Sequence, residues 1–274
     1  MIVEIAPAKI NLALHVRRRR ADGYHDIETL FAFARDGDAV SVETAEEDRF
    51  VITGPFADGL EAGADNLVAR AATAFVATFG IAGAHAITLD KHLPIASGIG
   101  GGSADAAATL RAFARLHHVP LDDPRLYAIA AALGADVPAC LDGRTTLGTG
   151  KGDALVAVEG LPDTPLLLVN PGVGVSTAAV FRTWDGVDRG GIAEGNLLAR
   201  ARAGRNDLEP PALVLAPVIA EVRAQFDAAP GVLLSRMSGS GATCFALFGD
   251  RGSCANAAAA ARGRGWWCLE TTLA

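Results

Sequence analysis

The chain has 274 residues, half of which are hydrophobic, and its formal net charge is −7 at pH 7. This length is typical of two domains, and the hydrophobic share is sufficient for a substantial core. The acidic balance argues against a general nucleic-acid binder, which would present a basic surface. No apolar run reaches the roughly 20 residues of a membrane helix, and no N-terminal stretch has the pattern of a secretory signal.

The cysteines indicate a reducing environment. They form no Cys-x-x-Cys pair and have no histidine at zinc-binding spacing. We therefore expect reduced thiols in a cytoplasmic protein and no metal site of the chain's own. The four are Cys140, Cys244, Cys254 and Cys268.

Two extended stretches open the chain, Ile2–Ile5 and Ala8–Val16, and Pro7 is expected to separate them as a break or bulge. Alternate residues from Lys9 onward share one face of the second stretch. Lys9 and Asn11, roughly 7 Å apart on such a strand, would then contact neighbouring atoms of one ligand. An exposed strand edge with unrelated polar residues is the alternative.

The only basic cluster is Arg17–Arg20, followed by the turn Ala21–Gly23. A solvated turn is the plain interpretation of this cluster, and local attraction of an anionic ligand is the alternative. A mostly apolar strand is predicted from residue 27 to 34. Two further strands, at residues 40–43 and 50–53, are expected to pair with each other.

A strand, a glycine-rich loop and a helix follow one another in the middle of the chain. The period-two stretch Ala84–Leu89 predicts the strand, and an alanine-rich stretch from Ser103 to about His117 predicts the helix. Between them, glycines at 98, 100, 101 and 102 let backbone N–H groups approach a ligand closely. These groups and the positive end of the helix dipole would converge on one point, which suits a phosphate group.

Two better-known phosphate motifs fit this loop poorly. The P-loop requires Lys and then Ser or Thr after its last Gly, whereas Ser103 and Ala104 follow Gly102. The Rossmann fingerprint requires Gly or Ala in place of Ser103, and an acidic residue about 20 positions on, where this chain has a helix end. A flexible linker or tight turn is the remaining alternative, although linkers rarely lie between a clear strand and a strong helix start.

Helix signals flank a further polar candidate. A helix is predicted from Asn66 to Phe79, with Asp65 as its N-cap and Gly80 after its end. Another is predicted from about residue 124 to 133, capped by the aspartate at 122 or 123. Asp136, in the segment Gly-Ala-Asp-Val-Pro-Ala, would either cap a short helix with proline in its first turn or serve a reaction. Residues 144–158 are punctuated by glycine and strand-like.

The second half of the chain has the element order β-α-α-β-β-α-β, which is compatible with a ferredoxin-like sandwich. Strands are predicted at residues 166–169, 232–237, 242–248 and 266–271. Ser176 and Thr177 are expected to cap a helix that contains Phe181 and Trp184, whereas residues 187–205 are loop-rich. Domains of residues 1–158 and 159–274 are therefore expected.

Three separated motifs resemble those of the GHMP superfamily of small-molecule kinases, which act on galactose, homoserine, mevalonate and phosphomevalonate. They are Pro7–Leu12, Pro94–Ala107 and Ser238–Thr243. Three further segments resemble the branch that acts on 4-diphosphocytidyl-2-C-methyl-D-erythritol, and the similarity runs nearly end to end. These segments are Ala21–His25, Gly134–Pro138 and Asn206–Glu209.

The resemblance implies an α+β fold of two domains. The N-terminal ATP-binding domain would be like the second domain of ribosomal protein S5, and the C-terminal domain ferredoxin-like, with the substrates meeting between them. The activity would be ATP-dependent phosphorylation of the tertiary 2-hydroxyl of the methylerythritol unit, in the non-mevalonate (MEP) isoprenoid pathway. ATP would carry Mg²⁺, the partners would be small molecules without nucleic acid or membrane, and the chain would be a monomer or weak homodimer.

The resemblance also implies roles for individual residues. Asp136 would accept the proton of the attacking hydroxyl, while Lys9 would orient that hydroxyl and offset developing negative charge. Positioning would matter more than proton removal, because a loose transition state needs little help from a base. The ATP phosphates would be wrapped by Pro94, Ile95, Ala96, Ser97, Gly98, Ile99, Gly100, Gly101, Gly102, Ser103 and Ala104.

Further residues would bind the second substrate. Stacking and edge hydrogen bonds to the cytosine would come from Tyr24, His25 and Phe181, with ordinary packing as the alternative. Other polar groups of the substrate would contact Asn11 and Thr177. The phosphate side would be lined by Gly239, Ser240 and Gly241. Two departures, Ala104 in place of a second serine and Ala139-Cys140 in place of aromatic residues, leave this chemistry untouched.

Two other functions compete with this one. A sister kinase acting on homoserine or mevalonate is disfavoured by the aromatic residues, because those substrates carry no base to stack. A nucleotide-binding regulatory module without catalysis would need neither Lys9 nor Asp136.

Overall fold

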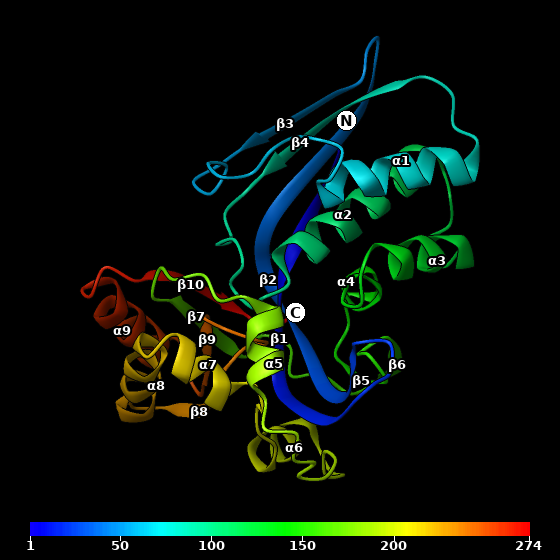
Figure 1. The fold of residues 1–274 in the computed structure, drawn as a ribbon. Helices are drawn as coiled ribbons and strands as arrows, with labels where there is room; N and C mark the ends of the chain where they lie inside the picture. The colour runs from blue at the N-terminus through cyan, green and yellow to red at the C-terminus, as the bar shows by residue number, and fades with distance from the viewer. The chain divides into compact units, whose positions relative to one another are not determined.

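The structure is a computed structural model that describes all residues from Met1 to Ala274. The chain forms two compact units that are not continuous in sequence. The first unit comprises residues 1–8, 36–95 and 100–143, and the second comprises 9–35, 96–99 and 144–274. Two long paired strands, β1 (Ile2–Arg19) and β2 (His25–Ala45), contribute to both units (Figure 1). The domain limits 1–158 and 159–274 stay a prediction.

In the first unit, β4 (Ala84–Asp90) lies between the other strands. It pairs in parallel with β3 (Arg49–Thr53) and antiparallel with β2, where Val42 lies opposite Ile87. The expected direct pairing of β2 with β3 is therefore wrong, because β4 takes up the hydrogen bonds of both strands. His85, Ile87 and Leu89 of β4 are buried and alternate with more exposed residues, as the period of two predicts.

Strand β1 runs through Pro7 without a break, so the predicted interruption is wrong. A proline lacks only its own N–H and is tolerated in a strand where the partner does not need that donor. Gly37 on β2 accommodates the proline, because a Cβ at Gly37 would lie 2.7 Å from the Pro7 Cα and 2.0 Å from the Ala6 carbonyl oxygen. The missing side chain lets the two backbones approach closely.

Four helices complete the first unit, and α1 packs along α2 (Figure 1). Phe75 and Phe113 meet between these two helices with ring centroids 5.5 Å apart. Helix α1 begins after Asn66, whose Oδ1 accepts a hydrogen bond from the Val68 N–H, so the predicted cap is one residue off. Gly80 ends it in the left-handed conformation, as predicted. The helices are α1 (Leu67–Phe79), α2 (Gly101–Leu116), α3 (Pro124–Leu133) and α4 (Val137–Asp142).

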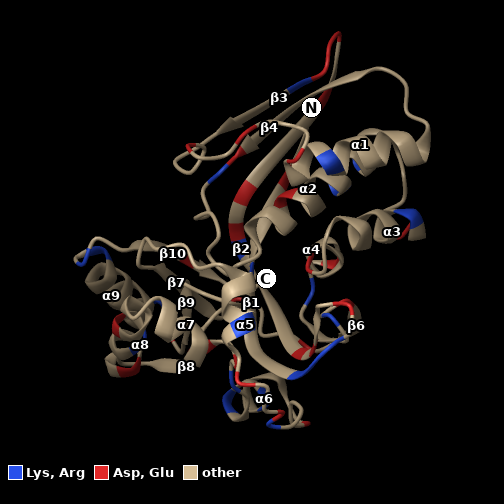
Figure 2. Ribbon diagram, in the orientation of Figure 1, with Lys and Arg blue, Asp and Glu red and all other residues tan.

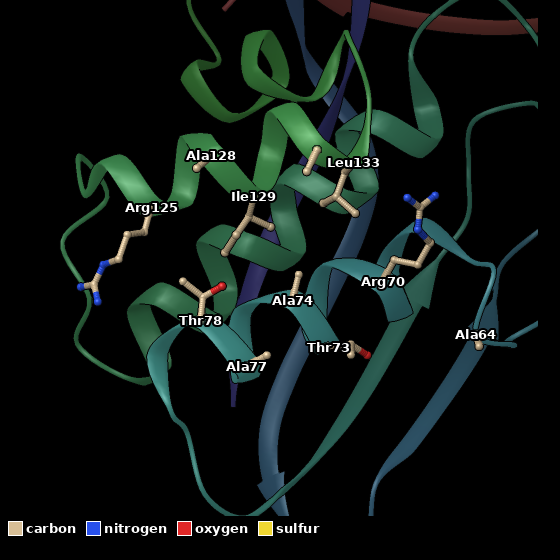
Figure 3. A pocket seen from close by; sticks show the side chains of 11 residues that line it. Ala64, Arg70, Thr73, Ala74, Ala77, Thr78, Arg125, Ala128, Ile129 and Leu133 are labelled. Atoms are coloured by element: carbon tan, nitrogen blue, oxygen red, sulfur yellow. The ribbon is translucent and has the colours of Figure 1, made fainter.

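Helices α1 and α3 border an open groove of about 680 Å³ (Figure 3). Alanine is the commonest residue of its lining, and none of the site residues predicted from the sequence belongs to it. The lining residues are Ala64, Arg70, Thr73, Ala74, Ala77, Thr78, Arg125, Ala128, Ile129, Ala132 and Leu133.

The second unit contains a four-stranded antiparallel sheet in the order β10-β7-β9-β8. Numbered within this sheet, the order is 4-1-3-2, and with the intervening helices it confirms the ferredoxin-like arrangement. Val169, Phe248 and Phe226 belong to one buried cluster formed by this sheet and its helices. The strands are β7 (Pro165–Asn170), β8 (Val232–Met237), β9 (Cys244–Phe248) and β10 (Trp267–Thr272).

Shorter elements fill the remainder of the second unit. A hairpin of β5 (Thr146–Thr149) and β6 (Ala154–Ala157) extends β2 on one side. Helix α6 (Leu197–Ala203) lies in the stretch that the sequence left unassigned, and Asn196 caps it by accepting from the Ala199 N–H. The other helices are α5 (Thr177–Thr183), α7 (Glu209–Leu215), α8 (Val218–Ala228) and α9 (Arg251–Arg262). No helix of the structure is both long and apolar enough to cross a membrane.

Candidate active site

The start of α2, directly after the glycine loop, has the geometry of an anion site. Gly100 is the N-cap in the left-handed conformation (φ 66°), and the helix begins at Gly101, two residues before the predicted start. The first hydrogen bond of the helix runs from the Ala104 N–H to the Gly100 carbonyl oxygen at 2.8 Å. The N–H groups of Gly101, Gly102 and Ser103 therefore have no acceptor within the helix, at the positive end of its dipole. A phosphate group is the natural ligand of such a place.

The middle of the glycine loop, residues 96–99, is held by the turn that follows β8. Ser238 Oγ donates to the Gly98 carbonyl oxygen at 2.9 Å, and the Thr243 N–H donates to the Ser97 carbonyl oxygen at 3.1 Å. Gly98 has φ 77°, and a Cβ there would lie 2.5 Å from the Ser238 carbonyl oxygen. Only glycine meets both requirements, so the loop and the turn come together at this residue.

Lys9 is buried among polar groups of the second unit. Its Nζ donates to Asn11 Oδ1 at 3.2 Å, which confirms that these two residues share a face of β1. Asn11 is held in turn, because its Nδ2 donates to Thr29 Oγ1 at 2.7 Å. The Lys9 N–H donates to the Ile99 carbonyl oxygen at 2.9 Å, which attaches this part of β1 to the glycine loop. The ammonium is thus oriented by its neighbours and lies 5.0 Å from the centroid of the Phe31 ring.

Asp136 occupies the N-cap position of α4, in the first unit. Its carboxylate accepts no capping hydrogen bond from that helix. By contrast, Asp123 at the start of α3 accepts from the Arg125 N–H at 2.9 Å, as a capping aspartate does. Helix capping therefore does not account for the Asp136 carboxylate.

His25 and Phe181, two residues assigned to the base, stack on each other in the second unit. Their ring centroids are 4.7 Å apart, and Trp184 meets His25 edge-on at 5.7 Å. His25 Nε2 and Trp184 Nε1 are buried without a hydrogen-bond partner. Burial, followed by the charge of Arg19, lowers the pKa of His25, which favours the neutral ring. The sequence predicts only that Trp184 lies in the same helix as Phe181; in the structure it is the C-cap of α5 (Thr177–Thr183).

The structure does not bring Tyr24 into this aromatic cluster. Its side chain is largely exposed, and Lys151 Nζ lies over its ring, 5.0 Å from the centroid. Thr177 contacts a different site residue, because its Oγ1 lies 2.8 Å from Ser240 Oγ in the turn after β8.

Asn206 belongs to the segment Asn206–Glu209 and has no predicted role of its own. Its Nδ2 donates to the carbonyl oxygens of Met237 and Gly239, both at 2.8 Å. Ser238, also without a predicted role, bridges the Gly98 carbonyl oxygen and the Asn11 N–H. Both residues fix the turn that holds the glycine loop, and neither could be placed before the long-range contacts were known.

The arginines of Arg17–Arg20 are matched by acceptors, mostly carboxylates. Arg17 pairs with Glu28 and Asp188, and Asp26 pairs with Arg18 and Arg20. Hydrogen bonds from Arg20 and Arg18 lower the pKa of Asp26. Figure 2 shows red segments interleaved with the blue ones. The salt-bridged turn is therefore the better interpretation, and little charge remains to attract an anion.

Comparisons with known proteins identify the family to which the chain belongs. Residues 66–144 match the family described as GHMP kinases N terminal domain, and residues 189–265 match GHMP kinases C terminal. The 4-diphosphocytidyl-2-C-methyl-D-erythritol kinase of Rhizorhabdus wittichii is 57% identical over 98% of this chain and 94% of its own length. That of Sphingopyxis alaskensis is 50% identical over 97% of this chain and 96% of its own length.

Solved structures give the same result at the level of the fold. A crystal structure of 4-(cytidine 5'-diphospho)-2C-methyl-D-erythritol kinase matches with a TM-score of 0.81 and 36% identity, covering 99% of this chain and 98% of that one. Homoserine kinase from Cytophaga hutchinsonii matches with a TM-score of 0.72 but only 19% identity, covering 99% of this chain and 94% of that one. The latter match establishes a shared fold.

Proposed function

Because the chain belongs to the family of 4-diphosphocytidyl-2-C-methyl-D-erythritol kinases, within the GHMP kinases, we propose that it phosphorylates the 2-hydroxyl of 4-diphosphocytidyl-2-C-methyl-D-erythritol with ATP. The products are the 2-phosphate and ADP, and the step belongs to the MEP route to isoprenoid precursors. The observation that carries this function is 57% identity over 98% of the chain to a relative of that name. A homoserine- or mevalonate-type kinase is not favoured, since those likenesses extend to the fold alone.

The ATP phosphates are assigned to the glycine loop, residues 94–104. The unpaired N–H groups at the start of α2 support this assignment, as does the hydroxyl of Ser103 beside them. Gly98 and Gly100 both have positive φ, a backbone conformation that favours glycine and that shapes the loop before the helix. Mg²⁺ carried by the nucleotide would offset the charge of its phosphate oxygens. The described residues offer no cluster of three or more His, Cys, Asp or Glu side chains that could hold an ion by themselves.

Lys9 and Asp136 are assigned to the accepting hydroxyl. Lys9 orients that oxygen and stabilises the negative charge that develops on it, while the Asp136 carboxylate accepts its proton. The hydrogen bond from Lys9 to Asn11 supports the first role, because it fixes the ammonium in a buried polar setting. The family of the chain supports the second, because Asp136 lies in the Gly134–Pro138 segment that resembles this branch.

The cytosine is assigned to His25, Phe181 and Tyr24. The unpartnered Nε2 of His25 supports recognition of a base edge, because a buried nitrogen without a partner costs free energy until a ligand pairs with it. Asn11 and Thr177 are assigned to other polar groups of this substrate. Residues 239–241 are assigned to the phosphate side of the site. The domain limits 1–158 and 159–274 are retained, since each family match falls within one of them.

Replacement of Asp136 tests the mechanism. Asp136→Asn is expected to bind ATP with unchanged affinity and to lose about 10²–10⁴ in kcat, because the amide neither accepts the proton nor positions the hydroxyl as the carboxylate does. Asp123→Asn is the matched control, because that aspartate caps a neighbouring helix and should leave kcat unchanged. Near-normal turnover of Asp136→Asn would remove this residue from the mechanism. Phosphorylation of mevalonate or homoserine, but not of the cytidine diphosphate compound, would overturn the choice of substrate.

A further inference from the structure

Three charged side chains form a buried cluster in the first unit, beside the start of α2. Lys91, directly after β4, donates through Nζ to Asp105 Oδ2 of α2 at 2.8 Å and to Asp38 Oδ2 of β2 at 2.5 Å. The three side chains are 4% exposed or less. A single ammonium therefore joins two strands of the sheet to the helix that follows the glycine loop.

Asp38 also fixes the chain that enters the glycine loop. Its Oδ1 accepts the backbone N–H groups of His92 and Leu93, at 2.5 and 2.7 Å. These residues immediately precede Pro94, the first residue of the proposed ATP-binding segment. The same carboxylate thus holds both Lys91 and the entry to the loop.

The ammonium of Lys91 packs directly against the first residue of α2. A Cβ at Gly101 would lie 3.0 Å from Lys91 Nζ and 3.8 Å from Asp38 Oδ2. Such a distance to the ammonium is tighter than ordinary packing, so glycine at this position makes room for the charged group. The N–H of Gly101 is one of the three that have no acceptor within the helix.

Stability alone is a poor reason for this cluster. With both carboxyl groups ionised, the cluster has a buried net negative charge, and apolar residues of similar size are often as stabilising or more so. One oxygen, Asp105 Oδ1, is buried without a hydrogen-bond partner. Burial raises the pKa of Asp105 to about 7, with Asp38 adding to the rise and Lys91 opposing it. Because the cluster costs folding free energy, we attribute it to the positioning of neighbouring groups rather than to stability.

We propose that Lys91 is a positioning residue for ATP, which holds the first turn of α2 against β2 and β4 so that the N–H groups of Gly101, Gly102 and Ser103 keep a fixed aim at the phosphates. This inference rests on the proposed function, since it takes the ATP phosphates to bind at this helix start. Lys91 itself touches no phosphate; it acts through the backbone of the helix.

The test compares ATP affinity with stability in two variants. Lys91→Met leaves two buried carboxyl groups without their counter-ion, so it should lower Tm. It should also raise the Kd for ATP about tenfold or more, an effect as large as the loss of one charged hydrogen bond. Lys91→Met/Asp105→Asn also removes one of the two carboxyl groups that lose their counter-ion, but it still lacks the bridge. It should regain most of the lost Tm and keep the weakened ATP binding, with KM for ATP raised and kcat at saturating ATP changed less than about threefold.

Other variants separate positioning from general destabilisation. Phe113→Leu loosens the core under the far half of α2 and should lower Tm without weakening ATP binding. If the methionine variants do not fold, Asp105→Asn replaces them in the test, because it is nearly isosteric and keeps the Lys91–Asp38 pair. This variant should weaken ATP binding about threefold. ATP affinity that recovers together with Tm in the double variant, or that is unchanged in Asp105→Asn, would overturn the inference.

Failure of the proposed function would look different. Suppose that Ser103→Ala weakens ATP binding while the Lys91 and Asp105 variants bind ATP normally. The ATP site is then supported, and the positioning role of Lys91 is refuted. If the wild-type protein binds no ATP, the proposed function falls first.

Discussion

Removal of the Ser238 hydroxyl should measure how firmly the turn after β8 holds the glycine loop. This fully buried Oγ donates to the Gly98 carbonyl oxygen at 2.9 Å and accepts from the Asn11 N–H at 3.3 Å. Ser238→Ala leaves both backbone groups without this partner, and an unsatisfied buried group costs about 1–3 kcal/mol. Gly98 is half-buried, so water can partly replace the hydroxyl there. A loss of about 1.5–3 kcal/mol in the free energy of unfolding is therefore expected.

Urea unfolding followed by tryptophan fluorescence is a suitable assay, because residues 184, 266 and 267, the three tryptophans, all lie in the same unit as Ser238. Ser235→Ala, on β8 three residues before Ser238, is the matched control: its hydroxyl bonds partly exposed side chains, and its loss should cost about 0.5 kcal/mol. The midpoint of Ser238→Ala should fall with an unchanged m-value, and KM for ATP should rise. Equal losses in the two variants would refute the argument.

Three further outcomes are expected. Phe181→Ala should weaken binding of the cytidine substrate far more than binding of ATP, measured by titration calorimetry; equal losses would refute the stacking assignment. Burial, then the nearby His85, lowers the pKa of His117, so the unfolded chain binds more protons than the folded one below pH 6.5. Stability should therefore decline as pH falls through this range, and His117→Gln, which still offers a partner to His85 Nε2, should show a shallower decline; an identical pH profile would contradict this. Burial raises the pKa of Cys268 to about 11 and raises that of Cys244 as well, so a disulfide reagent should label the urea-unfolded chain rapidly and the native chain slowly at pH 8.

Local chemistry made many elements of this fold predictable. Gly80 and Asp123 mark helix ends because each meets a backbone requirement within a few residues of itself. The glycine loop could be interpreted as a phosphate site because strand, glycines and helix are contiguous in sequence. Lys9 and Asn11 could be placed on one face for the same reason, through the period of two.

Long-range pairing explains what the sequence could not predict. The insertion of β4 between β2 and β3 depends on residues about 40 positions apart, and no local pattern distinguishes it from a hairpin. The continuity of β1 through Pro7 depends on a glycine at position 37. The cluster of Lys91, Asp38 and Asp105 joins three separate segments, each of which carries only an ordinary charged residue.

The division of β1 and β2 between the two units has a practical consequence for protein engineering. The hydrophobic cluster of the second unit includes Leu14, Val16 and Ile27 from the beginning of the chain, and the Leu14 carbonyl oxygen accepts the Asp207 N–H at 2.9 Å. A gene fragment that encodes only residues 159–274 would lack these groups and expose apolar surface in their place. Split reporters or half-gene libraries cut near the middle of this chain should therefore recover a folded product only when both pieces are expressed together.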